Sequence, residues 1–323
     1  MKEVNQPPII REIDFDALES GKTHKLWLKL IDDPLGNPVA VPVVIIKGKE
    51  PGKVLGITAA VHGNEINGIP IIQRMLRKVD PAELKGIILA VPVVNIPSFE
   101  RKKRRFVDNV DLNHIMPGNK KGNVSQVYAY RFFHKVIKNI DYLLDLHTAS
   151  GGRINSFYVR ADMKNKIASK LAKLQNPDII VHNPPADGTL RGAANALNIP
   201  AITLEVGNPN VFQNSMIKTG ITGLFNVIYQ LGMLDGEIVP DHSPVIRCSS
   251  SYWLYTNRGG ILTVLPSTTK IVEKGEKVAV LRDIFGSIIE EYFSPERGVV
   301  IGKSVSPVNQ SGGRILHLGL LRK

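Results

Sequence analysis

Five short runs of apolar and β-branched residues, each ending in turn residues, constrain the fold most strongly. They are KVLGITAAVHG (53–63), GIILAVPVVN (86–95), IDYLLDLHTAS (140–150), PDIIVHN (177–183) and IPAITLEVG (199–207). Near-continuous apolar runs are typical of strands buried on both faces of a sheet. Between these runs, apolar residues recur at helical spacing over residues 65–79, 125–140 and 163–175. Strands that alternate with helices predict an α/β fold with a mostly parallel, mixed sheet flanked by helices.

The pattern changes near residue 240, where helical spacing stops and short strands separated by turns take over. We therefore expect two domains, an α/β domain over residues 1–238 and a small all-β domain over residues 239–323. Within the second, GVVIGKS (298–304) is similar to a phosphate-binding loop. It has three residues between its glycines instead of four, and no helical pattern follows it. We interpret it as a turn.

The amino-acid composition excludes several classes of protein. Hydrophobic residues make up 43% of the 323 residues and charged residues 22%, as in ordinary soluble proteins. The longest apolar run is too short for a membrane span, and the N-terminus has no apolar core of the length that a signal peptide needs. The single cysteine, Cys248, rules out an internal disulfide. We therefore expect a cytoplasmic protein. The net charge is +12, but we interpret the basic run ERKKRRF (100–106) as a solvated face. Because aromatic residues are few and no nucleic-acid motif is present, we expect neither nucleic-acid nor membrane partners.

Four polar residues stand at the carboxyl ends of the expected strands: His62, Asn95, His147 and Glu205. In open α/β sheets, ligand sites form beyond this edge, so residues that are distant in sequence can meet there. We expect a functional site at this edge of the sheet.

The stretch AAVHGNEINGIP (59–70) places His62 and Glu65 three residues apart. Such a pair is too common by chance to indicate a metal site alone. With His147, however, it makes two histidines and one glutamate, and three protein ligands plus an open position are typical of catalytic zinc. A single cysteine excludes a cysteine-rich structural site. We therefore expect one Zn²⁺ ion per chain, bound by His62, Glu65 and His147.

Glu205 is the one carboxylate in the otherwise apolar run ITLEVG. A buried carboxylate is costly without a partner, and two partners fit the pattern. Glu205 could act as the general base on a water molecule at the metal, or it could pair with a buried arginine.

The motifs HGNE, DLN, DLH and EVG, in this order, resemble those of the succinylglutamate desuccinylase/aspartoacylase family, which has a zinc-carboxypeptidase-like fold. The resemblance implies hydrolysis of the amide bond of an N-acyl amino acid. It implies that His62, Glu65 and His147 are the zinc ligands and that Glu205 is the general base. It further implies that Arg105 polarises the scissile carbonyl, that Asn113 helps to hold a substrate carboxylate, and that Arg191 is a further anion-binding arginine.

One position departs from the family pattern. The family usually has D-L-N-R, whereas this chain has D-L-N-H, with His114 in place of the arginine. Arginine binds a carboxylate with a rigid fork of donors, while histidine offers one donor and can be neutral. Either the substrate lacks that carboxylate, or another residue binds it, such as Arg101, Lys103 or Arg104. His114 could also be a mere neighbour of the site.

Three functions are therefore expected in decreasing order. The first is a zinc-dependent hydrolase of a linear, non-peptide amide in an N-acyl amino acid or a similar small molecule. The second is a metallocarboxypeptidase that acts on peptides, and the third is a non-catalytic binding protein on the same fold. A homo-oligomer is compatible with each of them.

Overall fold

The computed structural model describes residues 6–184, 188–240 and 244–321. Its helices are α1 (Gly68–Leu76), α2 (Ile96–Glu100), η1 (Leu112–His114), α3 (Val124–Lys135), η2 (Ile137–Asn139), α4 (Lys166–Leu174), α5 (Leu190–Ala196) and α6 (Asn214–Gln230). Its first ten strands are β1 (Ile9–Ile10), β2 (Lys22–Asp32), β3 (Pro38–Lys47), β4 (Glu50–Ala59), β5 (Lys85–Val91), β6 (Tyr142–His147), β7 (Arg153–Asn155), β8 (Phe157–Ala161), β9 (Ile179–His182) and β10 (Ala201–Val206). The C-terminal strands are β11 (Ile246–Tyr255), β12 (Gly260–Val264), β13 (Ile271–Val272), β14 (Lys277–Arg282), β15 (Ile288–Phe293), β16 (Gly298–Ser304), β17 (Val308–Asn309) and β18 (Arg314–Leu321).

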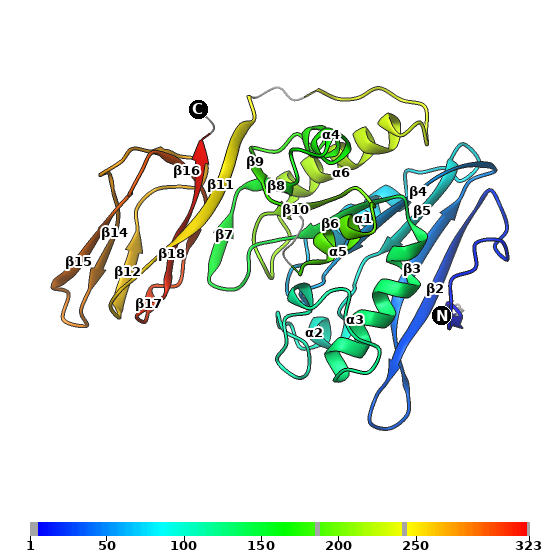
Figure 1. Ribbon diagram of the computed structural model, residues 1–323, viewed down its shortest axis with the longest axis horizontal. Helices are drawn as coiled ribbons and strands as arrows, with labels where there is room; N and C mark the ends of the chain where they lie inside the picture. Colours follow the sequence, from blue (N-terminus) through cyan, green and yellow to red (C-terminus); the bar gives the residue numbers. More distant parts are fainter. Residues whose placement is uncertain (1–5, 185–187, 241–243, 322–323) are drawn as a thin grey trace.

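A long mixed sheet runs through the molecule (Figure 1). Its strand order is β1-β2-β3-β5-β4-β6-β10-β8-β9-β11-β18-β16-β13, and β7 pairs with β16. The central strands β5, β4, β6 and β10 are parallel to one another. The α/β fold with a mostly parallel central sheet is therefore confirmed. The five apolar runs form β4, β5, β6, β9 and β10, which are largely buried.

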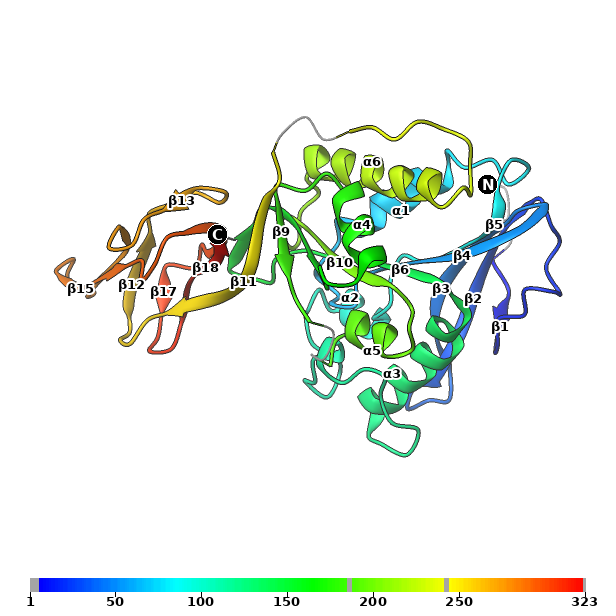
Figure 2. The same cartoon turned by 45° about the horizontal axis from the view of Figure 1, so that its top comes forward.

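Helices cover both faces of this sheet (Figure 2). Helices α1, α4 and α6 lie on one face, where their apolar residues join a core with β4, β6 and β10. Helices α3 and α5 lie on the other face, where α3 packs against β2 and α5 packs against β6 and β10. The helices expected over residues 65–79, 125–140 and 163–175 correspond to α1, α3 and α4. Burial on both faces explains why the central strands are apolar along their whole length.

Beyond residue 243 the described residues form strands and no helix, which agrees with the expected change to β structure. Strands β15-β14-β12-β17 make a second, antiparallel sheet, which packs over β16 and β18 around a separate apolar core. The main sheet does not stop at the expected boundary, because β11 pairs in parallel with β9. The C-terminal strands thus continue the main sheet of the α/β part.

The segment 298–304 is the strand β16, so the interpretation of GVVIGKS as a turn is wrong. Its residues are mostly buried, and it pairs with both β18 and β7. A Cβ atom added at Gly302 would lie 2.2 Å from Asn155 Oδ1, so the glycine allows β7 to approach closely. No helix in the described part of the chain is long and apolar enough to cross a membrane.

Candidate metal centre and active site

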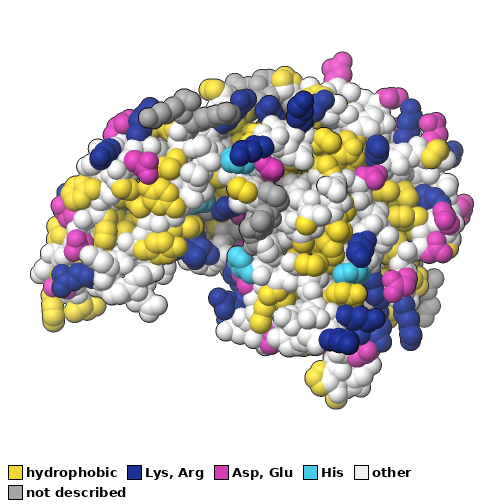
Figure 3. Space-filling view, in the orientation of Figure 1, with side chains coloured by type: hydrophobic (Ala, Val, Ile, Leu, Met, Phe, Trp, Pro, Cys, Tyr) yellow, Lys and Arg dark blue, Asp and Glu magenta, His cyan; other side chains and the backbone are white. Residues whose placement is uncertain are grey.

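A cavity of about 320 Å³ lies at the carboxyl ends of β4, β6 and β10. Its lining is mostly polar and comes from the α/β part, and Trp253 joins it from beyond the expected domain boundary. Its lining comprises His62, Glu65, Arg104, Asn113, His114, His147, Thr148, Ala149, Ser150, Arg153, Asn155, Tyr158, Arg160, Asn183, Thr189, Arg191, Thr203, Glu205 and Trp253. Figure 3 shows the surface hollowed between the C-terminal strands and the α/β part, with basic and histidine side chains beside the hollow.

His62 and Glu65 lie in the loop that joins the end of β4, at Ala59, to the start of α1, at Gly68. The Glu65 amide donates to the His62 carbonyl at 3.0 Å, so a tight turn brings the two side chains together. His62 Nδ1 lies 3.0 Å from Glu65 Oε1, and both side chains are buried. A Cβ atom at Gly63 would lie about 2 Å from backbone atoms of α2, because this loop packs directly on that helix.

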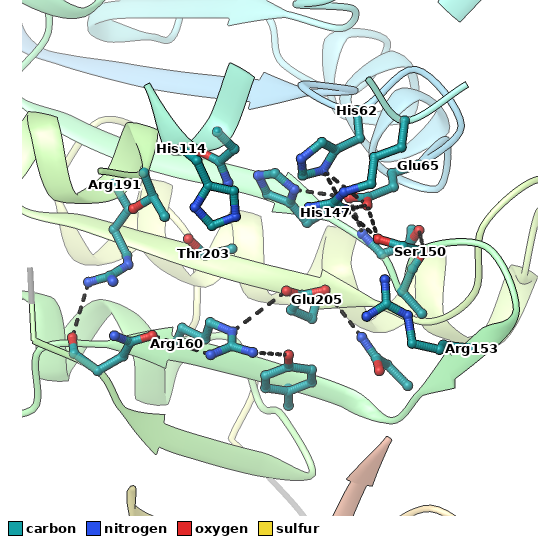
Figure 4. Close-up of a pocket in the computed structure, with 18 of the residues that line it drawn as sticks. His62, Glu65, His114, His147, Ser150, Arg153, Arg160, Arg191, Thr203 and Glu205 are labelled. Atoms are coloured by element: carbon teal, nitrogen blue, oxygen red, sulfur yellow. Dashed lines mark hydrogen bonds and ion pairs between the residues drawn. The ribbon is translucent and has the colours of Figure 1, made fainter. Parts of the chain in front are cut away.

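His147, the last residue of β6, completes a set of three possible metal ligands. Its Nδ1 lies 3.0 Å from Glu65 Oε2, and ligand atoms of His62, Glu65 and His147 all lie within 4.8 Å of one another. The sequence pattern predicts these three residues as one ligand set, and the fold places them side by side (Figure 4). One metal ion could be bound by all three.

Two aspartates orient the histidine rings. Asp111 Oδ1 lies 2.9 Å from His62 Nε2, and Asp145 Oδ2 lies 2.8 Å from His147 Nε2. Each carboxylate accepts from Nε2, so Nδ1 is the nitrogen of both rings that faces Glu65. Carboxylates that hold the outer ring nitrogen are typical of metal-binding histidines. The donor set therefore fits a divalent metal ion.

The electrostatics of the set also favour a cation. Burial would raise the pKa of Glu65, but His62, His147 and Arg104 outweigh it and hold that pKa well below its usual range. Burial would lower the pKa of His147, but Asp145 and Glu65 outweigh it and raise that pKa. The buried carboxylates of Glu65 and Asp145 both contact the His147 imidazole. Their negative charge favours a cation at this point, and a metal ion would supply it.

Arg104 is the arginine that reaches the ligand set. Its Nη1 donates to Glu65 Oε1 at 2.7 Å and also contacts the Ser150 hydroxyl, while its Nη2 lies 2.9 Å from Asp111 Oδ2. The side chain is 30% exposed, so it joins the buried ligands to the open cavity.

Arg105, to which the sequence assigned the carbonyl-polarising role, does not line the cavity. It is exposed, and its Nη1 donates to the Asn109 carbonyl at 3.1 Å. The next residue, Phe106, is buried against Tyr128 at 4.8 Å between ring centres. Because Phe106 points inward, Arg105 is turned toward solvent, and Arg104 is the residue that faces the site.

Glu205 stands in β10 directly beside His147, which is its register partner in β6. Its side chain is 14% exposed and lies between two partners. Asn155 Nδ2 donates to Oε2 at 3.3 Å, and Arg160 Nε lies 3.7 Å from Oε1. Burial raises the pKa of Glu205, with Arg160 and His147 opposing that shift. A carboxyl with a raised pKa can exchange a proton more readily near neutral pH.

His114 and Arg191 lie on the side of the cavity away from Ser150 (Figure 4), and Asn113 also lines the cavity. Asn113 Oδ1 accepts from the Leu190 amide at 2.8 Å, so its amide nitrogen is the atom that can donate to a ligand. The His114 side chain is 65% exposed at the cavity mouth. Arg191 is buried, and its guanidinium donates to the carbonyls of residues 183 and 184.

Sequence reasoning missed several residues of the site. Asp111 and Asp145 are the first residues of the motifs DLN and DLH, so their places in these motifs were an available signal. Arg153, Arg160 and Trp253 carry no comparable signal. Asn95, expected at the strand edge, does not line the cavity; it caps α2 and donates to the Val61 carbonyl at 3.0 Å.

Comparison with curated proteins finds similar chains among deacylases. A relative from Halomonas elongata, named N-alpha-acetyl-L-2,4-diaminobutyric acid deacetylase, is 24% identical over 314 residues, which cover 92% of this chain and 90% of the relative. A succinylglutamate desuccinylase from Pseudomonas paraeruginosa is 29% identical over 196 residues, which cover 55% of this chain and 58% of the relative.

Solved structures share the fold over nearly the whole chain. The product-bound ectoine utilization protein EutE (DoeB) from Ruegeria pomeroyi superimposes with a TM-score of 0.85 at 20% identity, over 94% of this chain and 97% of that chain. A succinylglutamate desuccinylase/aspartoacylase from Rhodobacter sphaeroides gives a TM-score of 0.87 at 19% identity, over 98% and 99% of the two chains.

The family assignment rests on the α/β part. Residues 51–231, which hold the three candidate metal ligands and Glu205, match the succinylglutamate desuccinylase/aspartoacylase catalytic domain. This match spans more than half of the chain, and the relatives named above are deacylases. The chain therefore belongs to the succinylglutamate desuccinylase/aspartoacylase family.

Proposed function

We propose that this protein is a zinc-dependent deacylase that hydrolyses the amide bond of a small N-acyl amino acid, with one zinc ion per chain. The observation that carries the proposal is the buried set of His62, Glu65 and His147 with Glu205 beside it on the next strand. The names of the relatives support an N-acyl amino acid as the class of substrate.

His62, Glu65 and His147 would hold the zinc ion, which when bound polarises a carbonyl and lowers the pKa of a water molecule to about 7. Asp111 and Asp145 contact Nε2 of the two rings and fix their orientation, so that Nδ1 of each ring is the atom that would bind the metal. The ligand set is rigid because β6 and the loop after β4 are both buried.

Glu205 is the proposed general base. It accepts a proton from the attacking water and later gives it to the leaving amine, a role for which its position beside His147 and its raised pKa are suited. Arg160 at 3.7 Å and Asn155 at 3.3 Å hold the carboxylate in place. Glu205 thus lies close to an arginine, Arg160, and also lines the cavity.

Arg104 takes the role that the sequence assigned to Arg105. Its guanidinium lies among the ligands and can donate to the oxygen that becomes negative when the amide carbonyl is attacked. Asn113, His114 and Arg191 are proposed to bind a substrate carboxylate on the other side of the cavity, and His114 offers a weaker grip than the usual arginine.

A substrate panel tests this function. The zinc-loaded protein is incubated with N-acetyl, N-succinyl and longer N-acyl derivatives of acidic, neutral and basic amino acids, and with unmodified peptides, and release of free amino acid is measured. We expect hydrolysis of N-acyl amino acids and no cleavage of peptides. A parallel sample of Glu205→Gln protein reports any contaminating hydrolase.

Two outcomes would contradict the proposal. Cleavage of peptides alone would support a metallocarboxypeptidase, which could use the same ligand set. A protein with full zinc content that hydrolyses no compound of the panel would support a binding protein. Residence in the cytoplasm stays a prediction from the single cysteine.

A further inference from the structure

Tyr158 lines the catalytic cavity beside the proposed general base. It lies in β8, where it is the register partner of Glu205 in the antiparallel pair β8–β10. Register partners of an antiparallel pair point to the same face of the sheet, with Cβ atoms about 5 Å apart. On its other side, Glu205 has His147 of β6 as its register partner. Glu205 therefore stands between a candidate metal ligand and a tyrosine.

The hydroxyl of Tyr158 is held by Arg160, two residues further along β8 and on the same face of the strand. Arg160 Nη2 donates to this hydroxyl at 2.9 Å, and Arg160 Cζ lies 5.3 Å from the centre of the tyrosine ring. The same guanidinium points toward Glu205 (Figure 4), with Nε 3.7 Å from Oε1. Since arginine has only donors, the hydroxyl oxygen accepts this bond, and its own proton is left for another acceptor.

The carboxylate of Glu205 is the acceptor that the geometry offers. Burial raises the pKa of the Tyr158 hydroxyl, and Glu205 raises it further, both as a nearby negative charge and as a hydrogen-bond acceptor, against the opposing effect of Arg160. The phenol therefore stays protonated at neutral pH and acts as a donor. Asn155 Nδ2 is a second donor to the same carboxylate, at 3.3 Å from Oε2.

Packing keeps the tyrosine ring in one position. Tyr158 is 1% exposed and belongs to an apolar core formed with residues of β9, β11 and β16. The buried His317 lies edge-on to the ring, with 6.1 Å between ring centres and 69° between planes. Because protein interiors are close-packed, this ring cannot turn away from the cavity. Its hydroxyl is thus a fixed donor next to Glu205.

We propose that Tyr158 is a positioning residue for Glu205, whose carboxylate its hydroxyl holds beside His147 by donating a hydrogen bond. The inference rests on the proposed deacylase function, in which Glu205 is the general base. A general base must lie within hydrogen-bond reach of the proton that it accepts. Surrounding hydrogen bonds that fix the orientation of such a group therefore increase the rate of the reaction without contacting the substrate.

The variant Tyr158→Phe tests this role, because it removes the hydroxyl and keeps the packed ring. With the substrate of the panel that is hydrolysed fastest, we expect kcat to fall about tenfold or more, as a hydrogen bond to a charged group is lost. KM and zinc content should stay near wild type. Wild-type kcat in Tyr158→Phe, whatever its KM, would overturn the proposal.

Tyr128→Phe is the matched control for the loss of a buried hydroxyl. Tyr128 is also fully buried, but its hydroxyl donates to the Val94 carbonyl at 2.7 Å and the residue does not line the catalytic cavity. This variant should keep wild-type kcat in its folded fraction. An equal fall of kcat in Tyr128→Phe and Tyr158→Phe would show a general effect on the fold and would refute the positioning role.

A double variant shows whether the hydroxyl acts through Glu205. Glu205→Gln has no general base to position, so adding Tyr158→Phe to it should change the residual kcat by less than about twofold. A hydroxyl that supports the cavity in some other way would lower kcat by the same factor in both backgrounds. Equal factors in the wild-type and Glu205→Gln backgrounds would contradict the proposal.

Melting temperatures test the contact without turnover. They are measured at saturating zinc for wild type, Tyr158→Phe, Glu205→Ala and the double variant. Removal of the hydroxyl should lower the melting temperature more in wild type than in Glu205→Ala, where the acceptor is already absent. The same decrease in both backgrounds would show that the hydroxyl does not bond to Glu205, and the proposal would fail.

The two kinds of measurement separate this inference from the proposed function. A protein that shows the coupling in melting temperature but hydrolyses no N-acyl amino acid refutes the deacylase function alone. A protein that hydrolyses N-acyl amino acids, with Tyr158→Phe as active as wild type, refutes the positioning role alone.

Discussion

In the proposed mechanism, single residues around the ligand set determine both metal affinity and proton transfer. His62 and His147 each present Nδ1 to the same point because Asp111 and Asp145 hold their outer nitrogens. Glu205 stands one strand away, in register with His147. Metal binding and proton transfer are thus assigned to different carboxylates, and substitutions can separate the two.

Asp145→Asn should weaken metal binding while the ligands stay in place. The amide can still accept from Thr58 Oγ1, which lies 2.7 Å from Asp145 Oδ1, but it no longer makes His147 more basic. Loss of such a partner typically costs 10- to 100-fold in metal affinity or activity. Zinc competition with a chelator measures the affinity. Asp141→Asn, an exposed position just before the same strand, is the control, and equal zinc affinity in both variants would contradict the orienting role.

Glu205→Gln should lower kcat by about 10² to 10⁴, because general-base catalysis is worth that much in rate. Zinc content and KM should stay near wild type, since the residue acts mainly in the transition state. The alternative role is a structural partner of Arg160. It predicts a lower melting temperature and, in the folded fraction, activity within about tenfold of wild type. Zinc content, melting temperature and kcat measured on one preparation decide between these roles.

His114→Arg should change substrate preference rather than stability, because the side chain is 65% exposed at the cavity mouth. An arginine there restores the two-pronged donor that the family pattern usually has. Turnover of acidic N-acyl amino acids should rise relative to neutral and basic ones. If the ranking of substrates is the same in both proteins, His114 does not contact the substrate.

At the scale of secondary structure, the site depends on contacts between strands that are distant in sequence. Strand β7 carries Asn155, which donates to Glu205, and β7 is paired with the C-terminal strand β16. Trp253, from β11, lines the same cavity. The C-terminal strands therefore shape the site as well as extending the sheet.

Gly302→Ala tests this dependence. Its Cβ would lie 2.2 Å from Asn155 Oδ1 and 2.8 Å from the Ile154 carbonyl, so β7 must shift. Overpacking of this kind costs about 1 to 3 kcal/mol, and we expect a lower melting temperature together with reduced kcat/KM at unchanged zinc content. Gly151→Ala is the matched control, because its Cβ meets no atom within 4 Å. Wild-type kcat/KM in Gly302→Ala would show that β7 does not position Asn155 for Glu205.

The parts of the fold and site that follow from local pattern could be predicted from the sequence. The central strands are apolar because both their faces are covered, and His62, Glu65 and His147 follow from the ends of those strands. The choice between Arg104 and Arg105 could not be predicted. It depends on the burial of Phe106 against Tyr128 in a loop that has no regular period.

At the scale of the whole molecule, one sheet joins the two parts of the chain. The pairing of β11 with β9 was not predicted, because parallel pairing between distant segments leaves no sequence period at the boundary near residue 239. The apolar core at this junction includes Tyr158, which also lines the cavity. The contact between Arg153 and the Trp253 ring, at 5.4 Å, forms through this arrangement.

The most direct test measures zinc content and hydrolysis of an N-acyl amino acid on the same samples of wild-type and His147→Ala protein. His147 is buried and contacts Glu65 and Asp145, so its loss removes one ligand from the set. We predict about one zinc ion per wild-type chain, loss of activity on chelation, recovery on addition of zinc, and low zinc content without activity in His147→Ala. Full zinc content in His147→Ala, or hydrolysis by metal-free wild-type protein, would contradict the account.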